Sequence, residues 1–274
     1  MDSSRHGSSK AWLLDVCIER NHAIIWIKTL DGKILKLFDI YQPTFYVLPK
    51  NGYEGDSLFQ VLSQQSMVKN LEWQDKFTDL FELDTHGMKR LICVYPESIL
   101  HYKPLVKRLE HDPRVAQLFN IDFSHIQQYL FTKLKIEPTS KVEVEYDKSD
   151  SRLIKISKIT EEEDVATPPF SILYFEIHTA SSSSPYNLGH DQIGEISVRY
   201  SQELEISFEG SEENIITEFC KYVLAKDPDI LICISNHFEH KNVLFERMSV
   251  LGLDLFLGRE DDSNNNNKTD RIRG

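Results

Sequence analysis

The sequence predicts two domains, an α+β domain followed by an α/β domain with a mixed sheet. Three observations carry this prediction. Turn-punctuated, β-rich runs open the chain, and alternating helix and strand patterns follow them up to about residue 137. A charged stretch with prolines then interrupts the pattern over 138–168, and a second series of strand and helix patterns begins beyond it. The expected divisions are therefore 1–137, 138–168 and 169–274.

The first domain is expected to contain short strands and three helices. Asp31-Gly32 between two apolar β-rich runs is a strong hairpin signal. Pro43 favours an edge strand or the start of a strand, and Pro104 and Asp112-Pro113 mark the two ends of a helix. The patterns predict strands at 12–16, 23–28, 34–38, 41–48, 89–94 and 115–119, and helices at about 55–66, 102–112 and 124–134.

Residues 138–168 are expected to link the two domains. Alternation over 142–146 predicts one solvent-facing hairpin, and the acidic run 161–164 is typical of a solvated linker. In the second domain, Ser211 is the expected N-cap of a helix that ends at Lys226-Asp227-Pro228. The patterns predict strands at 170–177, 193–200, 204–208 and 229–235, and helices from about 211 and from about 240 to 251. Strand meander, helix, parallel strand and helix is the order of a ribonuclease-H-like α/β layer.

The charge of the chain is divided unequally between its two halves. The net charge is −12, with a balance of +1 over residues 1–158 and of −13 over residues 159–274. An acidic domain repels duplex DNA, so the second half fits either a region whose DNA contacts lie elsewhere or a protein-docking module. Four widely spaced cysteines in apolar segments predict free thiols in a reducing compartment, and a cytoplasmic location is expected.

Several runs resemble a known family when their spacing is considered together. The runs Lys226–Ile232 and Leu257–Glu260, with Leu251-Gly252 between them, resemble the exonuclease domain of archaeal family-B DNA polymerases. In that pattern, residues 172–179 fall where the family carries its first exonuclease motif, an Asp-x-Glu strand. The runs that resemble the family's amino-terminal domain are 41–48, 111–115 and 121–130, so the resemblance covers nearly the whole chain from about Trp12.

The resemblance implies a proofreading site in which carboxylates hold two metal ions that activate water. Asp-x-Glu aims two carboxylates at the same metals, because residues i and i+2 of a strand share one face. This chain has Glu176 and His178 at those positions. The Glu176 side chain is one methylene longer, and an imidazole is a poor Mg²⁺ ligand. The Asp of the second motif falls on His240 or, with a one-residue gap, on Glu239, so the two-metal nuclease is expected to be inactive.

An alternative gives the same residues a different metal. Glu176, His178 and His240 could form a two-histidine, one-carboxylate group, whose ligand types suit Zn²⁺, Mn²⁺ or Fe²⁺. The simpler interpretation is that hydrogen-bonding polar residues fill an abandoned site, since no short metal-binding spacing supports the group. No cofactor is expected under that interpretation, and both interpretations stay open at this point.

Archaeal relatives also bind template uracil in a pocket of the amino-terminal domain. The positions that resemble this pocket are Pro43, Met88, His125, Gln128 and Tyr129. His125 and Gln128 replace the usual aromatic residue and arginine, and packing roles for the other three are the alternative. A modest basic face is expected from Lys103, Lys107, Arg108 and Arg114. That face is either a solvated helix surface or a phosphate contact.

The sequence thus predicts the amino-terminal and exonuclease-like region of an archaeal-type family-B DNA polymerase, with a structural and template-handling role in DNA replication. The expected partners are template DNA and a polymerase part or subunit that carries the palm, which this chain lacks; no membrane partner is expected. The missing parts would come from a second polypeptide, unless the chain is a shortened form. The alternatives are a metal-dependent exonuclease with unusual ligands and an acidic module that docks replication proteins.

Overall fold

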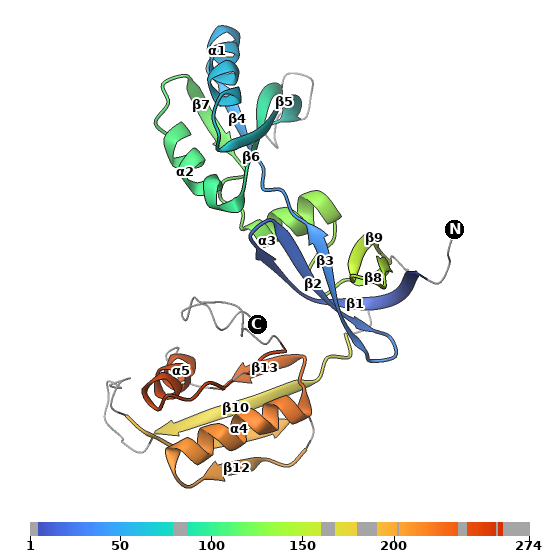
Figure 1. The fold of residues 1–274 in the computed structure, drawn as a ribbon, viewed down its shortest axis with the longest axis vertical. Helices are drawn as coiled ribbons and strands as arrows, with labels where there is room; N and C mark the ends of the chain where they lie inside the picture. Colours follow the sequence, from blue (N-terminus) through green and yellow to red (C-terminus); the bar gives the residue numbers. More distant parts are fainter. Residues whose placement is uncertain are drawn as a thin grey trace. The chain divides into compact units, whose positions relative to one another are not determined.

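The computed structural model describes residues 5–78, 87–159, 168–179, 191–201, 203–234, 240–255 and 257–259 (Figure 1). The chain divides into two compact units, Met1–Ala166 (unit 1) and Thr167–Gly274 (unit 2), and each is described by itself. None of the described helices combines the length and the apolar character that crossing a bilayer requires.

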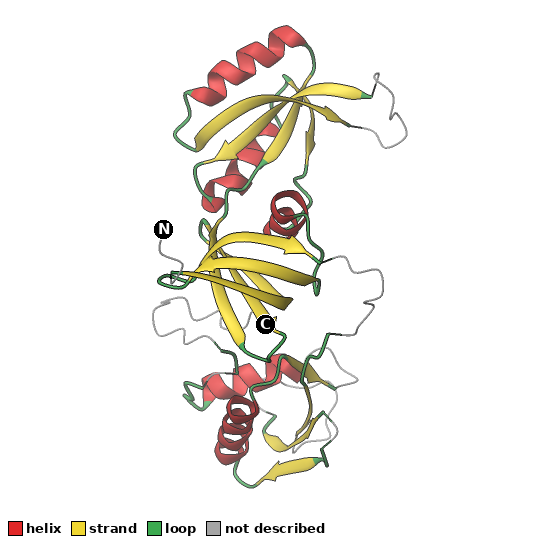
Figure 2. Cartoon of the chain, turned by 90° about the vertical axis from the view of Figure 1, so that its right-hand side faces the viewer, coloured by secondary structure: helices red, strands yellow, loops and turns green. Residues whose placement is uncertain are grey.

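A closed five-stranded barrel forms one part of unit 1 (Figure 2). Its strands are β1 (His6–Glu19), β2 (His22–Thr29), β3 (Ile34–Ile40), β8 (Lys141–Asp147) and β9 (Arg152–Lys158). Their order is β1-β2-β3-β9-β8, and β8 pairs back onto β1. Val142 and Val144 of β8 are fully buried in the barrel core. Residues 141–158 of the segment expected to be a linker with a solvent-facing hairpin therefore complete the barrel, because the alternating apolar side chains of β8 point inward.

A short helical segment closes one end of the barrel. It consists of α3 (His125–Gln128) and one π-helical turn, η1 (Tyr129–Leu134), where a single helix over 124–134 was expected. Ser124 and Gln127 form a capping box at its start. Tyr129 and Leu130 pack into the barrel core, and the Tyr129 hydroxyl donates to Asp39 Oδ2 on β3 at 2.7 Å.

The other part of unit 1 is an antiparallel sheet with two helices on one face. The sheet has the order β5-β6-β4-β7, and β4 (Phe45–Pro49) and β6 (Met88–Pro96) are its central strands. β5 (Val68–Phe77) and β7 (Val115–Phe119) lie at the edges. The helices α1 (Gly52–Ser63) and α2 (Ile99–Leu109) bury their apolar side chains in one cluster with those of β4 and β6.

Unit 2 is a mixed four-stranded sheet in the order β12-β11-β10-β13. Its strands are β10 (Ile172–Thr179), β11 (Ile193–Tyr200), β12 (Ile206–Glu209) and β13 (Ile230–Cys233), and β10 runs parallel to β13. The helices α4 (Glu212–Lys226) and α5 (His240–Val250) share one apolar cluster with Leu173, Phe175 and Ile177 of β10 (Figure 1). One face of the sheet is therefore packed against helices, and alternate residues of β10 point away from it.

Candidate functional site

The open face of the unit 2 sheet presents the two residues singled out on β10. Leu173, Phe175 and Ile177 point into the core, so Glu176 and His178 point to the opposite side. Their side chains are 47% and 48% exposed, and Glu176 Oε2 lies 3.9 Å from His178 Nε2. The pair attracts only when the imidazole is protonated, because 3.9 Å exceeds hydrogen-bonding distance. The two side chains can therefore act on the same ligand.

The neighbouring strands surround this pair with few further ligands. Ser197 lies opposite Glu176 and Glu195 opposite His178 on β11. On β13, Cys233 lies opposite Phe175 and packs against the helix-covered core instead of the open face. Burial and then the Glu176 carboxylate raise the pKa of its thiol. Among the residues that the structure describes, no three His, Cys, Asp or Glu side chains are grouped as a metal centre requires.

His240 and Glu239 complete the set of candidate site residues of unit 2. His240 is the first residue of α5, but its side chain is outside the described part of the structure. Glu239 itself also lies outside the described residues. The grouping of Glu176, His178 and His240 around a metal therefore remains a prediction.

The runs that carry the family resemblance meet at the end of α4. Arg259 donates from Nε to Asp227 Oδ1 at 2.6 Å, and its other donors reach Asp229 Oδ1 and the backbone oxygens of Asp227 and Pro228. The Asp229 side chain is only 1% exposed, and its Oδ2 accepts from the Ser171 N–H and hydroxyl at 2.8 and 2.9 Å. This cluster fastens the end of α4 and the start of β13 to the residue before β10.

A second buried ion pair, which sequence patterns did not indicate, joins the two helices. Arg247 of α5 binds both carboxylate oxygens of Glu212 at 2.7 Å, and the side chains are 5% and 8% exposed. Glu212 also accepts from the Ile193 N–H at the start of β11. Burial alone would raise the pKa of Glu212, but the Arg247 guanidinium and the Ile193 N–H hold it below its ordinary value. This contact orients the helices and does not face the open side of the sheet.

The four residues of the expected basic face are only partly available. Arg114 forms a two-pronged contact with Asp112, at 2.9 and 2.7 Å, and Arg108 donates to Gln65. Lys103 and Lys107 are exposed on α2, one helical turn apart. The structure thus leaves two lysines of the four as the main candidates for phosphate contact.

Four of the five positions that resemble the uracil pocket lie near each other, with the Tyr129 ring in edge contact with Tyr41, and Met88 lies apart. Gln128 is buried, and its amide joins the hydroxyls of Tyr41 and Tyr102, while Tyr41 also contacts His125 Nδ1 at 3.0 Å. Burial and then Lys103 lower the pKa of His125, which favours the neutral ring. Pro43 follows Tyr41 by two residues and is buried. Because β4 and β6 are antiparallel with Phe45 opposite Val94, Met88 lies roughly 20 Å farther along β6.

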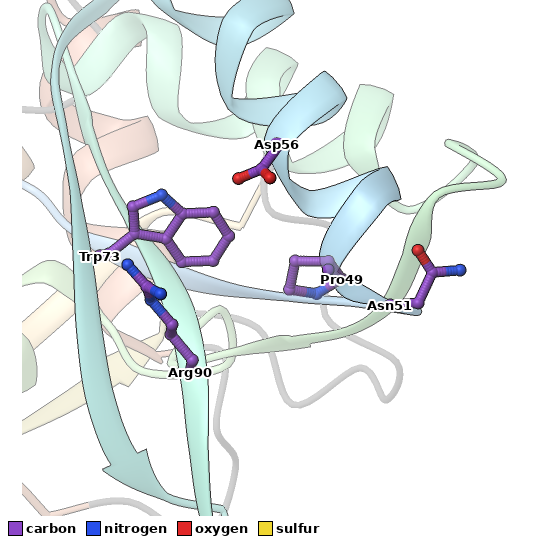
Figure 3. Close-up of a pocket in the computed structure, with 6 residues that line it drawn as sticks. Pro49, Asn51, Asp56, Trp73 and Arg90 are labelled. Atoms are coloured by element: carbon purple, nitrogen blue, oxygen red, sulfur yellow. The ribbon is translucent and has the colours of Figure 1, made fainter.

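The structure also contains a surface hollow of about 280 Å³ beside α1 (Figure 3). It is lined by Pro49, Asn51, Gly52, Asp56, Trp73 and Arg90. The Arg90 guanidinium lies 4.9 Å from the centre of the Trp73 ring, whose plane is stacked on Phe59. Arg90 and Asp56 both border the hollow in Figure 3 and form no ion pair with each other. None of the candidate residues from the sequence lies in its lining.

Comparison with known proteins shows which proteins this chain resembles in sequence and fold. No protein-family model matches the chain. DNA polymerase 2 of Aeropyrum pernix is 24% identical over 269 residues, a match that covers 90% of this chain and 33% of that protein. The structure of the family B DNA polymerase from the archaeon Pyrobaculum calidifontis matches with a TM-score of 0.72 and 19% identity, and again covers 90% of this chain and 33% of that one. The chain is homologous to archaeal family-B DNA polymerases.

The relation to family-B polymerases extends through both units, since each match covers nine-tenths of the chain. The chain spans about a third of the length of these relatives. The runs that resemble the polymerase family contain Asp227, Asp229 and Arg259. These charged side chains hold α4 and β13 next to β10, so this part of the resemblance has a structural role. Glu176 and His178, the positions that correspond to the first exonuclease motif, lie on β10 and face its open side.

Proposed function

We propose that the chain is the amino-terminal and exonuclease-like part of a family-B DNA polymerase. Its role would be architectural and template-handling, with a proofreading site that no longer supports two-metal catalysis. The observation that carries this proposal is the exposed face of β10, where one carboxylate, Glu176, stands beside His178 at 3.9 Å. A two-metal site on this strand would need two carboxylates on that face, and an imidazole does not replace one for Mg²⁺.

We also propose that unit 2 is a ribonuclease-H-like domain. Its support is the strand order β12-β11-β10-β13, in which three antiparallel strands are followed by a helix and a strand parallel to β10. In this arrangement β10 is an inner strand, so Glu176 and His178 lie at the middle of the sheet rather than at its edge.

The nuclease part of the proposal is tested by following 3′-end degradation of a 5′-labelled single-stranded DNA with Mg²⁺, Mn²⁺ or Zn²⁺. We expect no shortening with any metal. The double variant Glu176→Asp, His178→Glu restores the carboxylate pattern on β10 and tells whether the rest of the site is intact. Metal-dependent shortening by the unsubstituted chain that disappears in His178→Ala would contradict an inactive site.

A second candidate function is a metal-dependent nuclease that uses Zn²⁺ or Mn²⁺. It is favoured by the short distance between Glu176 and His178 on one exposed face, since a carboxylate and an imidazole are ordinary ligands of these metals. Metal content after dialysis against Zn²⁺ separates the two functions. One equivalent of zinc that is lost in both His178→Ala and His240→Ala would support the nuclease, whereas no bound zinc would support the architectural role.

The polymerase role implies a partner. Because the chain spans about a third of its relatives, we propose that polymerisation is carried out by the remaining family-B regions, on a further segment or on another polypeptide. Tagged chain should capture a polypeptide that carries the palm of the same polymerase from cells that contain both. Absence of such capture, with the palm polypeptide present and folded, would contradict the arrangement on two polypeptides.

A further inference from the structure

The two edges of the unit 2 sheet differ in how they are protected from further pairing. β12 and β13 are the outer strands of this sheet. On β12, Ser207 and Glu209 face the open side and are exposed, and a charge on an edge strand hinders the addition of another strand. On the other edge, the run from Ile230 to Ile234 contains no charged residue. β13 is therefore the less protected edge of unit 2.

The side chains along β13 are apolar on both faces of the strand. Leu231 and Cys233 pack against the helix-covered core. Ile232 and Ile234 point to the open face and are 36% and 46% exposed. A continuous apolar run is typical of a strand in a parallel sheet that is covered on both faces. In the described part of unit 2, however, β13 has only β10 beside it.

The backbone of β13 directs alternate residues to its outer side. The Ile230 N–H donates to the Ser171 carbonyl at 3.1 Å, and the Ile234 N–H donates to the Phe175 carbonyl at 2.7 Å. Alternate residues of a paired strand bond to the same neighbour, so the N–H and carbonyl groups of Leu231 and Cys233 point away from β10. No described strand lies on that side. These two residues therefore carry the backbone groups that an added strand would bind.

We propose that the outer edge of β13 pairs with an apolar β-strand of the same polymerase, supplied by the family-B region outside this chain. Main-chain hydrogen bonds would hold the added strand, and its apolar side chains would meet Ile232 and Ile234. A helix or loop laid over the face would leave the outward backbone groups without partners. The choice of occupant rests on the proposed function. Each match covers 33% of the relative, which leaves about two thirds of its length to supply the strand.

Amide hydrogen exchange, followed residue by residue by NMR, tests the proposal. The 274-residue chain alone is compared with the chain assembled with the palm-carrying family-B region, joined to it or added as a separate polypeptide. Exchange at Leu231 and Cys233 should slow about 10-fold or more on assembly, the effect of one new hydrogen bond. Exchange at Ile232 should change little, because its N–H faces β10 in both samples. Equal changes at all three residues would point to a covering element other than a strand and would overturn the proposal.

Substitutions on the two edges supply matched variants. Ile232→Lys places a charge on β13 at a side chain that is already 36% exposed, so unit 2 should stay folded while the added protection is lost. Ile234→Lys is a second variant with the same expected result. Ile206→Lys is the control, because Ile206 is 39% exposed on β12, the opposite edge, and protection should persist. Circular dichroism confirms that each variant is folded.

Other occupants of the edge give different results in the chain alone. Slow exchange at Leu231 and Cys233 in the dilute chain would mean that residues of this chain cover the edge. Slowing that increases with the concentration of the chain alone would make a second copy the occupant. Either result would overturn the proposal, and so would equal protection in the Ile232→Lys and Ile206→Lys assemblies. If the palm-carrying region binds while exchange at Leu231 and Cys233 is unchanged, the proposed function stands and the pairing at β13 fails.

Discussion

The barrel of unit 1 closes on itself, whereas the sheet of unit 2 is covered by helices on one face. Every barrel strand pairs on both sides, and the interior is filled by apolar side chains. In unit 2, Ile232 and Ile234 are 36% and 46% exposed, and Ile232 lies opposite Tyr174 on β10. Unit 2 adds two buried charge contacts to its single apolar layer. The Glu212–Arg247 pair and the Arg259–Asp229 pair provide them.

The difference makes the two units separable in experiments. The three tryptophans, Trp12, Trp26 and Trp73, all lie in unit 1. Tryptophan fluorescence therefore reports the unfolding of unit 1 alone, while circular dichroism reports the helices and strands of both. Substitutions at the buried charges of unit 2 should therefore shift the circular dichroism transition and leave the tryptophan fluorescence transition unchanged.

The largest expected effect comes from Arg247→Met. The substitution leaves the Glu212 carboxylate buried without its partner, which typically costs about 3–5 kcal/mol of unfolding free energy. The double variant Glu212→Met, Arg247→Met replaces both charges by apolar groups and should lose much less. Urea unfolding followed by circular dichroism measures both, with tryptophan fluorescence unchanged. Equal losses in the single and double variants would show that the pair is not held as a buried charge contact.

Arg259→Ala should have a smaller effect on the same unit. The Asp229 side chain is 1% exposed and keeps its two bonds from Ser171, so it loses only part of its hydrogen bonding. We expect a loss of about 1–3 kcal/mol from the stability of unit 2, as for other buried groups that lose a partner. Arg199→Ala is a suitable control, because Arg199 is an exposed arginine of the same unit. A loss no larger than that of the control would argue against the cluster as a fastening of α4.

Gly55→Ala tests apolar packing in unit 1. A Cβ at residue 55 would lie 2.9 Å from the Trp73 ring and 3.0 Å from Pro49, and the ring is backed by Phe59. Overpacking should outweigh the gain in helix propensity and destabilise unit 1 by about 1 kcal/mol. Gly52→Ala in the same helix has open space around it and serves as the control. Stabilisation by both substitutions, measured by tryptophan fluorescence, would show that Trp73 can move aside.

Local patterns predicted the elements of both units better than they predicted the partners of those elements. The hairpin at Asp31-Gly32 and the strand over 193–200 follow from turn chemistry and short-range alternation. β8 alternates in the same way, but alternation does not say which face is buried, and its partner β1 is more than 130 residues away in the chain. No element was indicated over Val68–Phe77, an edge strand in which no residue is buried and most are polar or charged, so its hydrophobic pattern is weak.

The same limit applies to the candidate site. The strand period predicts that Glu176 and His178 share a face, and the structure places both on the open side of β10. Contacts between distant side chains had no comparable signal. Tyr41 meets Gln128 across 87 residues, and Arg247 meets Glu212 across 35, and neither pair has a local pattern that would reveal it.

Acidification should destabilise unit 2 at a higher pH than unit 1, and this is the smallest of the expected effects. The folded-state pKa of Glu212 lies below its ordinary value of 4.5, so the Arg247 contact contributes stability above that value, and the contribution is lost as pH falls through the folded pKa. In unit 1, the Ser149 hydroxyl and N–H lower the pKa of Asp147 from 3.8 to about 2, so its contribution persists to lower pH. As pH falls below 4.5, the circular dichroism transition should therefore weaken before the tryptophan transition. The double variant at Glu212 and Arg247 should lose this difference, and an earlier loss of the tryptophan signal would reverse the assignment of charge dependence to unit 2.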